Sequence, residues 1–118
     1  VSGRRVAKVV VVVVAGGSPV MLALPADRRV HWPSLYTVLG TDRVRLATET
    51  EMAGWFGDTA LGAEPPLRHW KGVELWMDES LRTGGDIVFP AGTHEDGIRM
   101  PFEDWLRLAE PWMASFTV

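Results

Sequence analysis

A run of six valines over residues 9–14 is the feature that most constrains the fold of this chain. β-Branched side chains favour extended strands, and the apolar run of residues 9–15 is too short to span a membrane. The next segment (AGGS) has the composition of a turn, and residues 19–24 are mainly apolar again. We therefore predict a hairpin in which a buried strand over residues 5–14 returns through residues 19–24.

The rest of the chain predicts short strands and helices separated by glycine and proline. Helices are predicted over residues 33–39, 49–56 and 101–109, the second from the capping-box pattern TETE at residues 48–51. Strands are predicted over residues 44–47, 73–77 and 87–89, with a brief extension at 98–100 and an edge strand within 113–118. The pattern predicts one domain over residues 1–118 with a mixed α+β (α/β) fold, a hairpin-rich sheet with three short helices.

Composition narrows the classes of function. The 118 residues include no cysteine, which removes disulfides, thiol nucleophiles and thiolate metal sites and fits a cytoplasmic protein. A net charge of −3 argues against a broadly basic nucleic-acid surface, although it leaves room for a local basic patch. No phosphate-binding loop, dinucleotide fingerprint or Gly-x-Ser-x-Gly motif occurs. The three histidines lack ligand spacing, so neither a metal nor another cofactor is predicted.

The segment GAEPP, residues 62–66, is the first candidate for chemistry. Gly62 has no Cβ, so its N–H can approach a ligand closely or adopt a φ that other residues avoid. The two prolines fix φ and stiffen the loop that follows. A stiff loop with an accessible N–H can hold a carbonyl group or an oxyanion. The same composition is also typical of an ordinary tight turn.

Three side chains near strand ends are further candidates. Lys8 lies beside the valine run, where it either supplies a buried charge or extends its ammonium group into water. Asp78 follows the predicted strand at residues 73–77, where it either binds substrate or caps the next turn. His94 lies in a glycine-containing loop, where it either contacts substrate or is simply solvated.

Five segments in this order resemble the YbaK/EbsC family, the prolyl-tRNA-editing-like aminoacyl-tRNA deacylases. The resemblance covers residues 6–116 and rests on VAKVV at 6–10, LPAD at 24–27, GAEPP at 62–66, MDESL at 77–81 and AGTH at 91–94. No single segment is specific, but a lysine on the first strand combined with a Gly-x-x-x-Pro loop and an Asp-x-Ser-Leu turn is fairly specific.

The resemblance implies a mixed, largely antiparallel sheet or barrel with short flanking helices. It also implies a trans-editing hydrolase that cleaves the ester of mischarged tRNA without a cofactor. Lys8 and Gly62 match residues with catalytic roles, with the loop backbone holding the substrate carbonyl. Pro66, Asp78, Gly92 and His94 fall in segments that would contact substrate. The implied partner is the acceptor end of aminoacyl-tRNA, with no membrane.

Two departures from the family leave alternatives open. The family's helical segment ahead of the lysine strand is missing from these residues, and the 62–66 loop lacks the serine that many relatives carry before the first proline. One rival hypothesis is a non-catalytic module that binds tRNA or a protein. Another is a metal-dependent hydrolase built on His94, His69 and nearby carboxylates. Homodimerisation through a sheet edge and association with an aminoacyl-tRNA synthetase also remain open.

Overall fold

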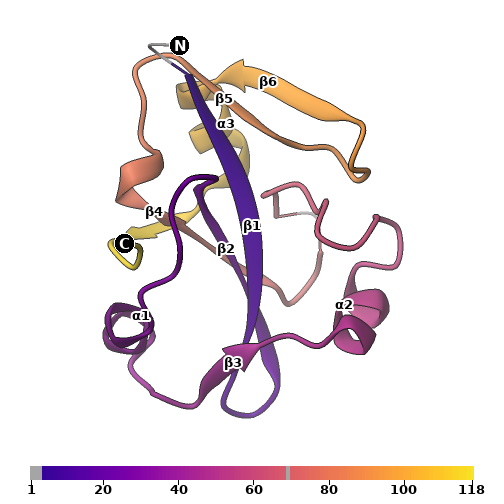
Figure 1. The fold of residues 1–118 in the computed structure, drawn as a ribbon, viewed down its shortest axis with the longest axis vertical. Helices are drawn as coiled ribbons and strands as arrows, with labels where there is room; N and C mark the ends of the chain where they lie inside the picture. The colour runs from indigo at the N-terminus through magenta and orange to yellow at the C-terminus, as the bar shows by residue number, and fades with distance from the viewer. Residues whose placement is uncertain (1–3, 69) are drawn as a thin grey trace.

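The computed structural model describes residues 4–68 and 70–118, which form a seven-stranded sheet with three α-helices and one short 3-10 helix (Figure 1). The strands are β1 (Arg4–Val14), β2 (Ser18–Pro25), β3 (Val44–Leu46), β4 (Glu74–Asp78), β5 (Asp86–Pro90), β6 (Gly97–Pro101) and β7 (Trp112–Ala114). The helices are α1 (Trp32–Leu39), α2 (Glu49–Trp55), α3 (Phe102–Ala109) and the 3-10 helix η1 (Glu79–Leu81). The predicted mixed α+β fold is confirmed.

The predicted valine hairpin forms the centre of the sheet. β1 and β2 pair antiparallel in an unbroken register from Ala7 opposite Pro25 to Val14 opposite Ser18. The strand order is β6-β5-β1-β2-β4-β7, and β3 pairs with the far end of β1. The pairs β1–β2, β1–β3 and β5–β6 are antiparallel and β1–β5, β2–β4 and β4–β7 are parallel, but most of the paired residues belong to the antiparallel pairs. The hairpin therefore carries all the other strands on its two outer edges.

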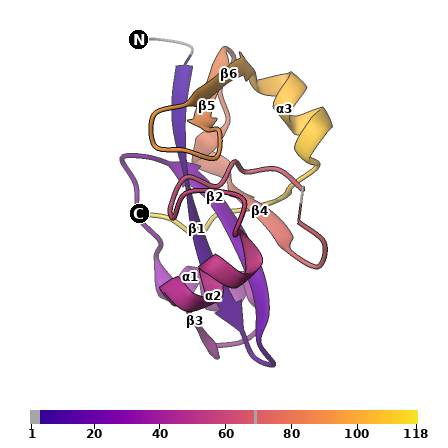
Figure 2. The ribbon, with the colours of Figure 1, turned by 90° about the vertical axis from the view of Figure 1, so that its right-hand side faces the viewer.

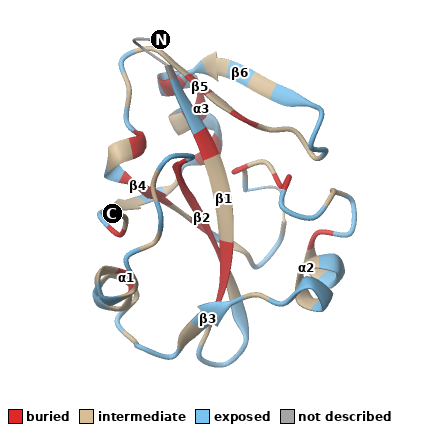
Figure 3. Cartoon of the chain, viewed as in Figure 1, coloured by how far each residue is buried: buried red, intermediate tan, exposed pale blue. Residues whose placement is uncertain are grey.

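Alternation along the central strands separates two apolar clusters. Odd-numbered residues of β1, such as Ala7 and Val11, pack with the aromatic side chains of α3, whereas Val12 packs with Leu35 of α1. Side chains alternate between the faces of a strand, so one run of valines serves both clusters. Figure 3 shows the buried residues in the middle of the sheet and in a short loop segment beside β1.

The predicted element ends hold to within one residue except at the C-terminus. The edge strand predicted within residues 113–118 is wrong in extent, because β7 ends at Ala114 and only Thr117 pairs again, with Val30. The Asp78 carboxylate accepts the N–H of Phe116 at 2.7 Å. A side chain thus takes the hydrogen bond that a neighbouring strand would otherwise take. The short η1 helix is also absent from the sequence prediction.

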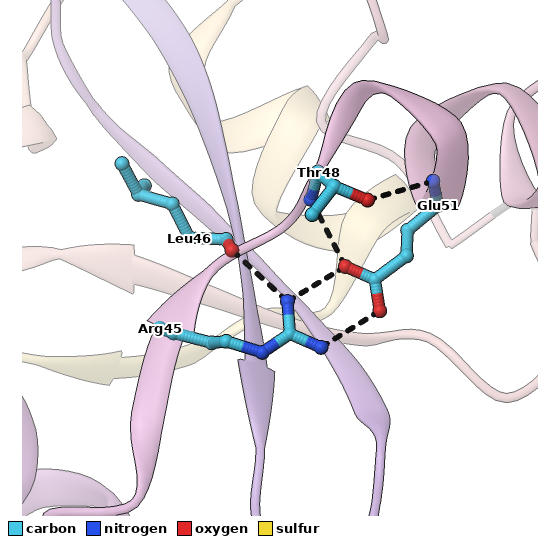
Figure 4. A network of polar contacts seen from close by, with 4 residues as sticks. All are labelled: Arg45, Leu46, Thr48 and Glu51. Carbon is cyan, nitrogen blue, oxygen red and sulfur yellow. Dashed lines mark hydrogen bonds and ion pairs between the residues drawn. The ribbon is translucent and has the colours of Figure 1, made fainter.

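Helix α2 begins with the predicted capping box (Figure 4). The Thr48 N–H donates to Glu51 Oε1 at 2.9 Å, and the Glu51 N–H donates to Thr48 Oγ1 at 3.1 Å. Arg45 of β3 adds a bidentate pair to the Glu51 carboxylate at 2.7 and 2.9 Å and donates to the Leu46 carbonyl. This network ties β3 to α2 and so places the helix beside the loop that follows it.

We predict that Glu51 makes the stability of the protein depend on pH in strongly acidic solution. The hydrogen bond from Arg45, followed by that from the Thr48 N–H, lowers the pKa of Glu51 from 4.5 to about 2. Its contribution is therefore present above pH 4.5 and is lost as the pH falls through about 2. In urea unfolding between pH 4.5 and about 2, the free energy of unfolding is expected to fall more steeply for the wild type than for Glu51→Gln. The difference is expected to be modest because these side chains are open to solvent.

Glu49→Gln is the matched control, since Glu49 lies on the same helical turn but outside the hydrogen-bonded network. It is expected to keep the pH profile of the wild type. Parallel profiles for the wild type and Glu51→Gln would contradict the prediction.

Candidate functional site

Two glycine-containing loops, far apart in the sequence, are joined by backbone hydrogen bonds. The Ala60 N–H donates to the Gly92 carbonyl at 2.7 Å, and the Gly92 N–H donates to the Ala63 carbonyl at 2.9 Å. The Ala63 N–H closes a turn onto the Ala60 carbonyl at 3.0 Å. Figures 1 and 2 both show the loop between α2 and β4 beside the middle of β1. The fold thereby brings together three of the segments singled out in the sequence, residues 6–10 on β1, 62–66 and 91–94.

Gly62 adopts the left-handed conformation that its residue type permits, with φ of 82°. A Cβ at this position would lie 3.6 Å from His94 Cε1, so the histidine ring packs against the glycine. The Gly62 N–H donates to Glu64 Oε1 at 3.2 Å. The amide that the sequence suggested as an oxyanion donor thus has a carboxylate as its acceptor in this structure.

The proline end of the loop is held by α3. Trp105 is fully buried, and its Nε1 donates to the Pro66 carbonyl at 2.9 Å. The Leu67 N–H turns back onto the Pro65 carbonyl at 2.8 Å. Because proline also fixes φ, the 62–66 loop is restrained by its own residues and by a core side chain. Pro66 therefore shapes the site through its backbone.

Glu64 is the site residue that the sequence analysis missed. Only 1% of its surface is exposed, and Oε2 is buried without a hydrogen-bond partner among residues 4–68 and 70–118. Buried carboxylates normally have partners, because an unpaired buried charge is costly. The available signal was an acidic residue between an alanine and two prolines, where it caps no helix.

Lys8 lies on the stretch of β1 that no strand covers on its outer edge. β5 pairs with β1 as far as Val6, and β3 pairs with it only from Val12. The half-buried lysine stands opposite Leu24 on β2. Within the part of the chain that the structure describes, its Nζ makes no hydrogen bond or ion pair. Its ammonium group is therefore available to a ligand.

Asp78 is engaged elsewhere, at the end of β4. Its buried carboxylate accepts hydrogen bonds from the N–H of Phe116, from the N–H and hydroxyl of Ser80, and from the Thr117 hydroxyl. Burial raises the pKa of Asp78, but these donors outweigh it and the net pKa lies below the usual value. Each of these donors belongs to η1 or the C-terminal segment, so the carboxylate joins those two segments.

Two cavities are near the 62–66 loop, the first through His94, whose ring packs against Gly62, and the second through Glu64 itself. One, of about 280 Å³, is lined by exposed His94 together with Ala7, Phe89 and Thr93. The other, of about 390 Å³, is lined by Glu64 and by side chains of and around α2: Glu49, Met52, Ala53, Phe56, Thr59 and Leu61. The larger is of the size of small-molecule sites, and the smaller is just below that range. Gly62 therefore contacts one lining residue of each cavity, His94 of the smaller and Glu64 of the larger.

The structure thus brings together Gly62, Pro66, Gly92 and His94, with Lys8 on the strand alongside and Asp78 apart. Across the described ranges, no three histidine or carboxylate side chains gather where they could hold a metal ion. His69, one residue of the metal hypothesis, lies outside the described residues. No helix among the described residues is long and apolar enough to cross a membrane.

Comparison with known proteins gives a family. The family model of the aminoacyl-tRNA editing domain matches residues 1–108. No curated protein matches the chain. Among solved structures, hypothetical protein APE2540 is similar with a TM-score of 0.82 and 21% identity, over 100% of this chain and 77% of that one. A proposed trans-editing enzyme for prolyl-tRNA synthetase is similar with a TM-score of 0.82 and 22% identity, over 96% and 70%.

The same fold also occurs inside a larger protein. A proposed signal transduction protein from Marinobacter aquaeolei VT8 is similar with a TM-score of 0.79 and 20% identity, over 97% of this chain but 25% of that one. At these identities the solved structures establish the fold. The match to the editing-domain model, which spans most of the chain, establishes the family.

Proposed function

Because the chain belongs to the aminoacyl-tRNA editing domain family, we propose that it hydrolyses the ester bond of mischarged tRNA. The observation that carries the proposal is Gly62, held in a left-handed conformation by a stiff loop and packed against His94. His94 and Glu64, which both contact Gly62, each line a cavity that would take one side of an aminoacyl ester. These features support a role for the Gly62 amide in binding the substrate carbonyl.

The proposed reaction is addition of water to the ester carbonyl. The carbonyl oxygen becomes an oxyanion, and the Gly62 N–H donates to it in place of Glu64 Oε1. One such donor lowers a barrier by about 3–4 kcal/mol in acyl transfer. The C–O bond between the acyl carbon and the ribose oxygen then breaks. The hydroxyl of the water stays on the acyl carbon, and the other proton of the water goes to the ribose oxygen. In this scheme the neighbouring ribose hydroxyl orients the water, because an aminoacyl ester is already activated.

The remaining candidates take supporting roles in the proposal. The Lys8 ammonium, which has no partner among residues 4–68 and 70–118, either binds the terminal adenosine or its phosphate, or stabilises the charge of the intermediate. His94 and the Gly92 backbone border the substrate, and Pro66 keeps the loop rigid. The hydrogen bonds of Asp78 support a role in holding the C-terminal segment rather than in direct substrate contact.

The partners follow from the substrate. The acceptor end of a mischarged tRNA is the proposed ligand, and the proposed location is the cytoplasm, alone or bound to an aminoacyl-tRNA synthetase. β6 and β7 end the sheet and are the edges along which a second copy would pair.

A binding module without catalysis is the alternative function. Two observations favour it: the Gly62 N–H already has an acceptor, and Trp112 is 64% exposed on edge strand β7. Trp112 stacks on Trp76 with ring centroids 6.0 Å apart, which leaves an aromatic surface open to a partner. This alternative predicts binding of tRNA or protein without ester cleavage.

The test is to incubate the protein with a panel of labelled mischarged tRNAs and to compare Gly62→Ala with Gly72→Ala. Both glycines have a left-handed φ, 82° and 81°, so alanine strains the backbone similarly, by about 1–2 kcal/mol. Only Gly62 lies against His94, whereas a Cβ at Gly72 meets nothing within 4 Å. We expect the wild type and Gly72→Ala to release the same amino acid and Gly62→Ala to lose about tenfold or more in kcat/KM.

Each other outcome has a definite meaning. Equal losses in both variants would assign the effect to stability and remove Gly62 from the reaction. If the folded wild-type protein cleaves no member of the panel, the hydrolase proposal fails and binding of tRNA or protein becomes the function to measure.

A further inference from the structure

We propose that Glu64 binds the α-ammonium group of the aminoacyl ester, so that the site accepts free aminoacyl-tRNA and rejects tRNA whose amino acid is acylated on nitrogen. This inference rests on the proposed function and names the part of the substrate that the loop would recognise. It arises from a carboxylate that is buried, half satisfied and next to the candidate carbonyl donor.

The first step is that the Glu64 carboxylate receives too few hydrogen bonds. Glu64 is 1% exposed, and its only hydrogen-bond donor in the described structure is the Gly62 N–H, at 3.2 Å. That distance is at the long end of the normal range, and Oε2 has no partner in the part of the chain that the structure describes. A cationic ligand would donate charge-assisted hydrogen bonds to this carboxylate.

The second step is that the carboxylate is held in place by the fold. The backbone on both sides of Glu64 is fixed, through Gly92 before it and through Trp105 after it. A charged group on such a frame is placed for a ligand before the ligand arrives, which reduces the cost of ordering it.

The third step is the match to substrate chemistry. In an aminoacyl ester the α-nitrogen is two bonds from the carbonyl carbon. The Gly62 N–H and the Glu64 carboxylate are likewise neighbours in one loop. When substrate binds, the carbonyl oxygen takes the Gly62 N–H and the ammonium group takes the carboxylate. After this exchange both the Gly62 N–H and the Glu64 carboxylate have a partner, a carbonyl oxygen for the N–H and an ammonium group for the carboxylate.

The fourth step is the space beside the carboxylate. Glu64 lines the cavity of about 390 Å³ whose walls include Met52, Phe56 and Leu61. Two carboxylates line this cavity, the exposed Glu49 and the buried Glu64. The apolar side chains suit the α-carbon and a small side chain of the substrate, with the ammonium group at the buried carboxylate. Acylation of the nitrogen removes its charge and adds bulk at this position, so both electrostatics and space oppose an N-blocked substrate.

The experiment compares the fastest-cleaved aminoacyl-tRNA of the panel with its N-acetyl derivative, for the wild type, Glu64→Gln and Glu103→Gln. Each kcat/KM is divided by the spontaneous hydrolysis rate of the same ester, because acetylation also changes its intrinsic reactivity. We expect the wild type to favour the free amine at least tenfold and Glu64→Gln to bring the ratio near one. Glu103 is exposed on α3, so Glu103→Gln is expected to keep the wild-type ratio.

A ratio unchanged by Glu64→Gln would overturn the proposal, since it would mean that the carboxylate only shapes the loop. A wild-type ratio near one would also overturn it. If the wild type cleaves neither ester, the hydrolase proposal fails and calorimetry on amide-linked 3′-alanylamino-3′-deoxyadenosine tests Glu64 separately. At least tenfold tighter binding of this compound than of its N-acetyl form, abolished in Glu64→Gln, would support the inference. Equal binding would overturn it.

Discussion

Replacement of Lys8 by alanine is expected to lower kcat/KM for deacylation by about 10²–10³-fold, as loss of one preorganised charge contact to a transition state does. Lys8 stands on the uncovered edge of β1, and its ammonium group has no partner in the described structure. A group that binds nothing in the free protein gains its interactions with the ligand. Its removal should therefore reduce activity far more than stability. The measurement is single-turnover ester loss on the cleaved tRNA.

Two further variants separate charge from packing. Lys8→Met keeps an unbranched apolar stem in the strand and removes the charge, so it is expected to lose as much activity as Lys8→Ala. Lys71, the other lysine of the chain, is exposed in a turn, and Lys71→Ala is expected to retain activity. Unchanged turnover in a folded Lys8→Ala protein would remove Lys8 from the reaction.

Replacement of Asp78 by asparagine is expected to reduce the free energy of unfolding by about 2–4 kcal/mol, measured by urea denaturation. Oδ1 accepts from the Phe116 N–H, and Oδ2 accepts from the Ser80 N–H and the Thr117 hydroxyl. An asparagine amide has one oxygen and one NH₂ group. The NH₂ group would therefore face the donors that now bond to one of the two carboxylate oxygens. The defect is buried, because Asp78 is only 3% exposed.

Asp86→Asn is the control for Asp78→Asn. Asp86 pairs with Arg99 at 2.6 Å, but the Arg99 side chain is 62% exposed, so this change is expected to cost under about 1 kcal/mol. The net pKa of Asp78 lies below 3.8, so its contribution is present above that pH and is lost as the pH falls below it. In Asp78→Asn the free energy of unfolding should fall less steeply with decreasing pH below 3.8. Equal costs for the two variants would contradict the network as a source of stability.

The parts of the fold that could be predicted from sequence are those governed by local rules. The valine run with its glycine turn specified the hairpin, and the pair Thr48 and Glu51 specified the start of α2. Gly62 was expected either to let a ligand approach closely or to adopt a φ that other residues avoid, and its φ of 82° is of the second kind. Each of these outcomes depends on neighbours within a few residues.

The misses involve contacts between distant residues. The C-terminal strand was predicted too long, because the competing acceptor for Phe116 is Asp78, 38 residues away. Glu64 was quoted within a motif without a role, because its burial depends on how α2 and the glycine loops pack around it. No periodicity or spacing rule contains either fact.

The sequence by itself determined that this chain forms a valine hairpin within a mixed sheet, that it resembles an editing domain, and that a stiff glycine–proline loop would be central. The hairpin and the stiff loop follow from φ preferences, strand alternation and turn chemistry, which act over short distances. The resemblance to an editing domain rests on the order and spacing of five short segments. Only the tertiary structure decided which candidates meet. It joined the Gly62 loop to Gly92 through Ala60 and Ala63, and it placed His94 against Gly62. It engaged Asp78 with the C-terminal segment and buried Glu64 with one oxygen that has no partner among the described residues. Burial and long-range hydrogen bonds exist only after the segments pack, and packing therefore decided the chemistry available at this site.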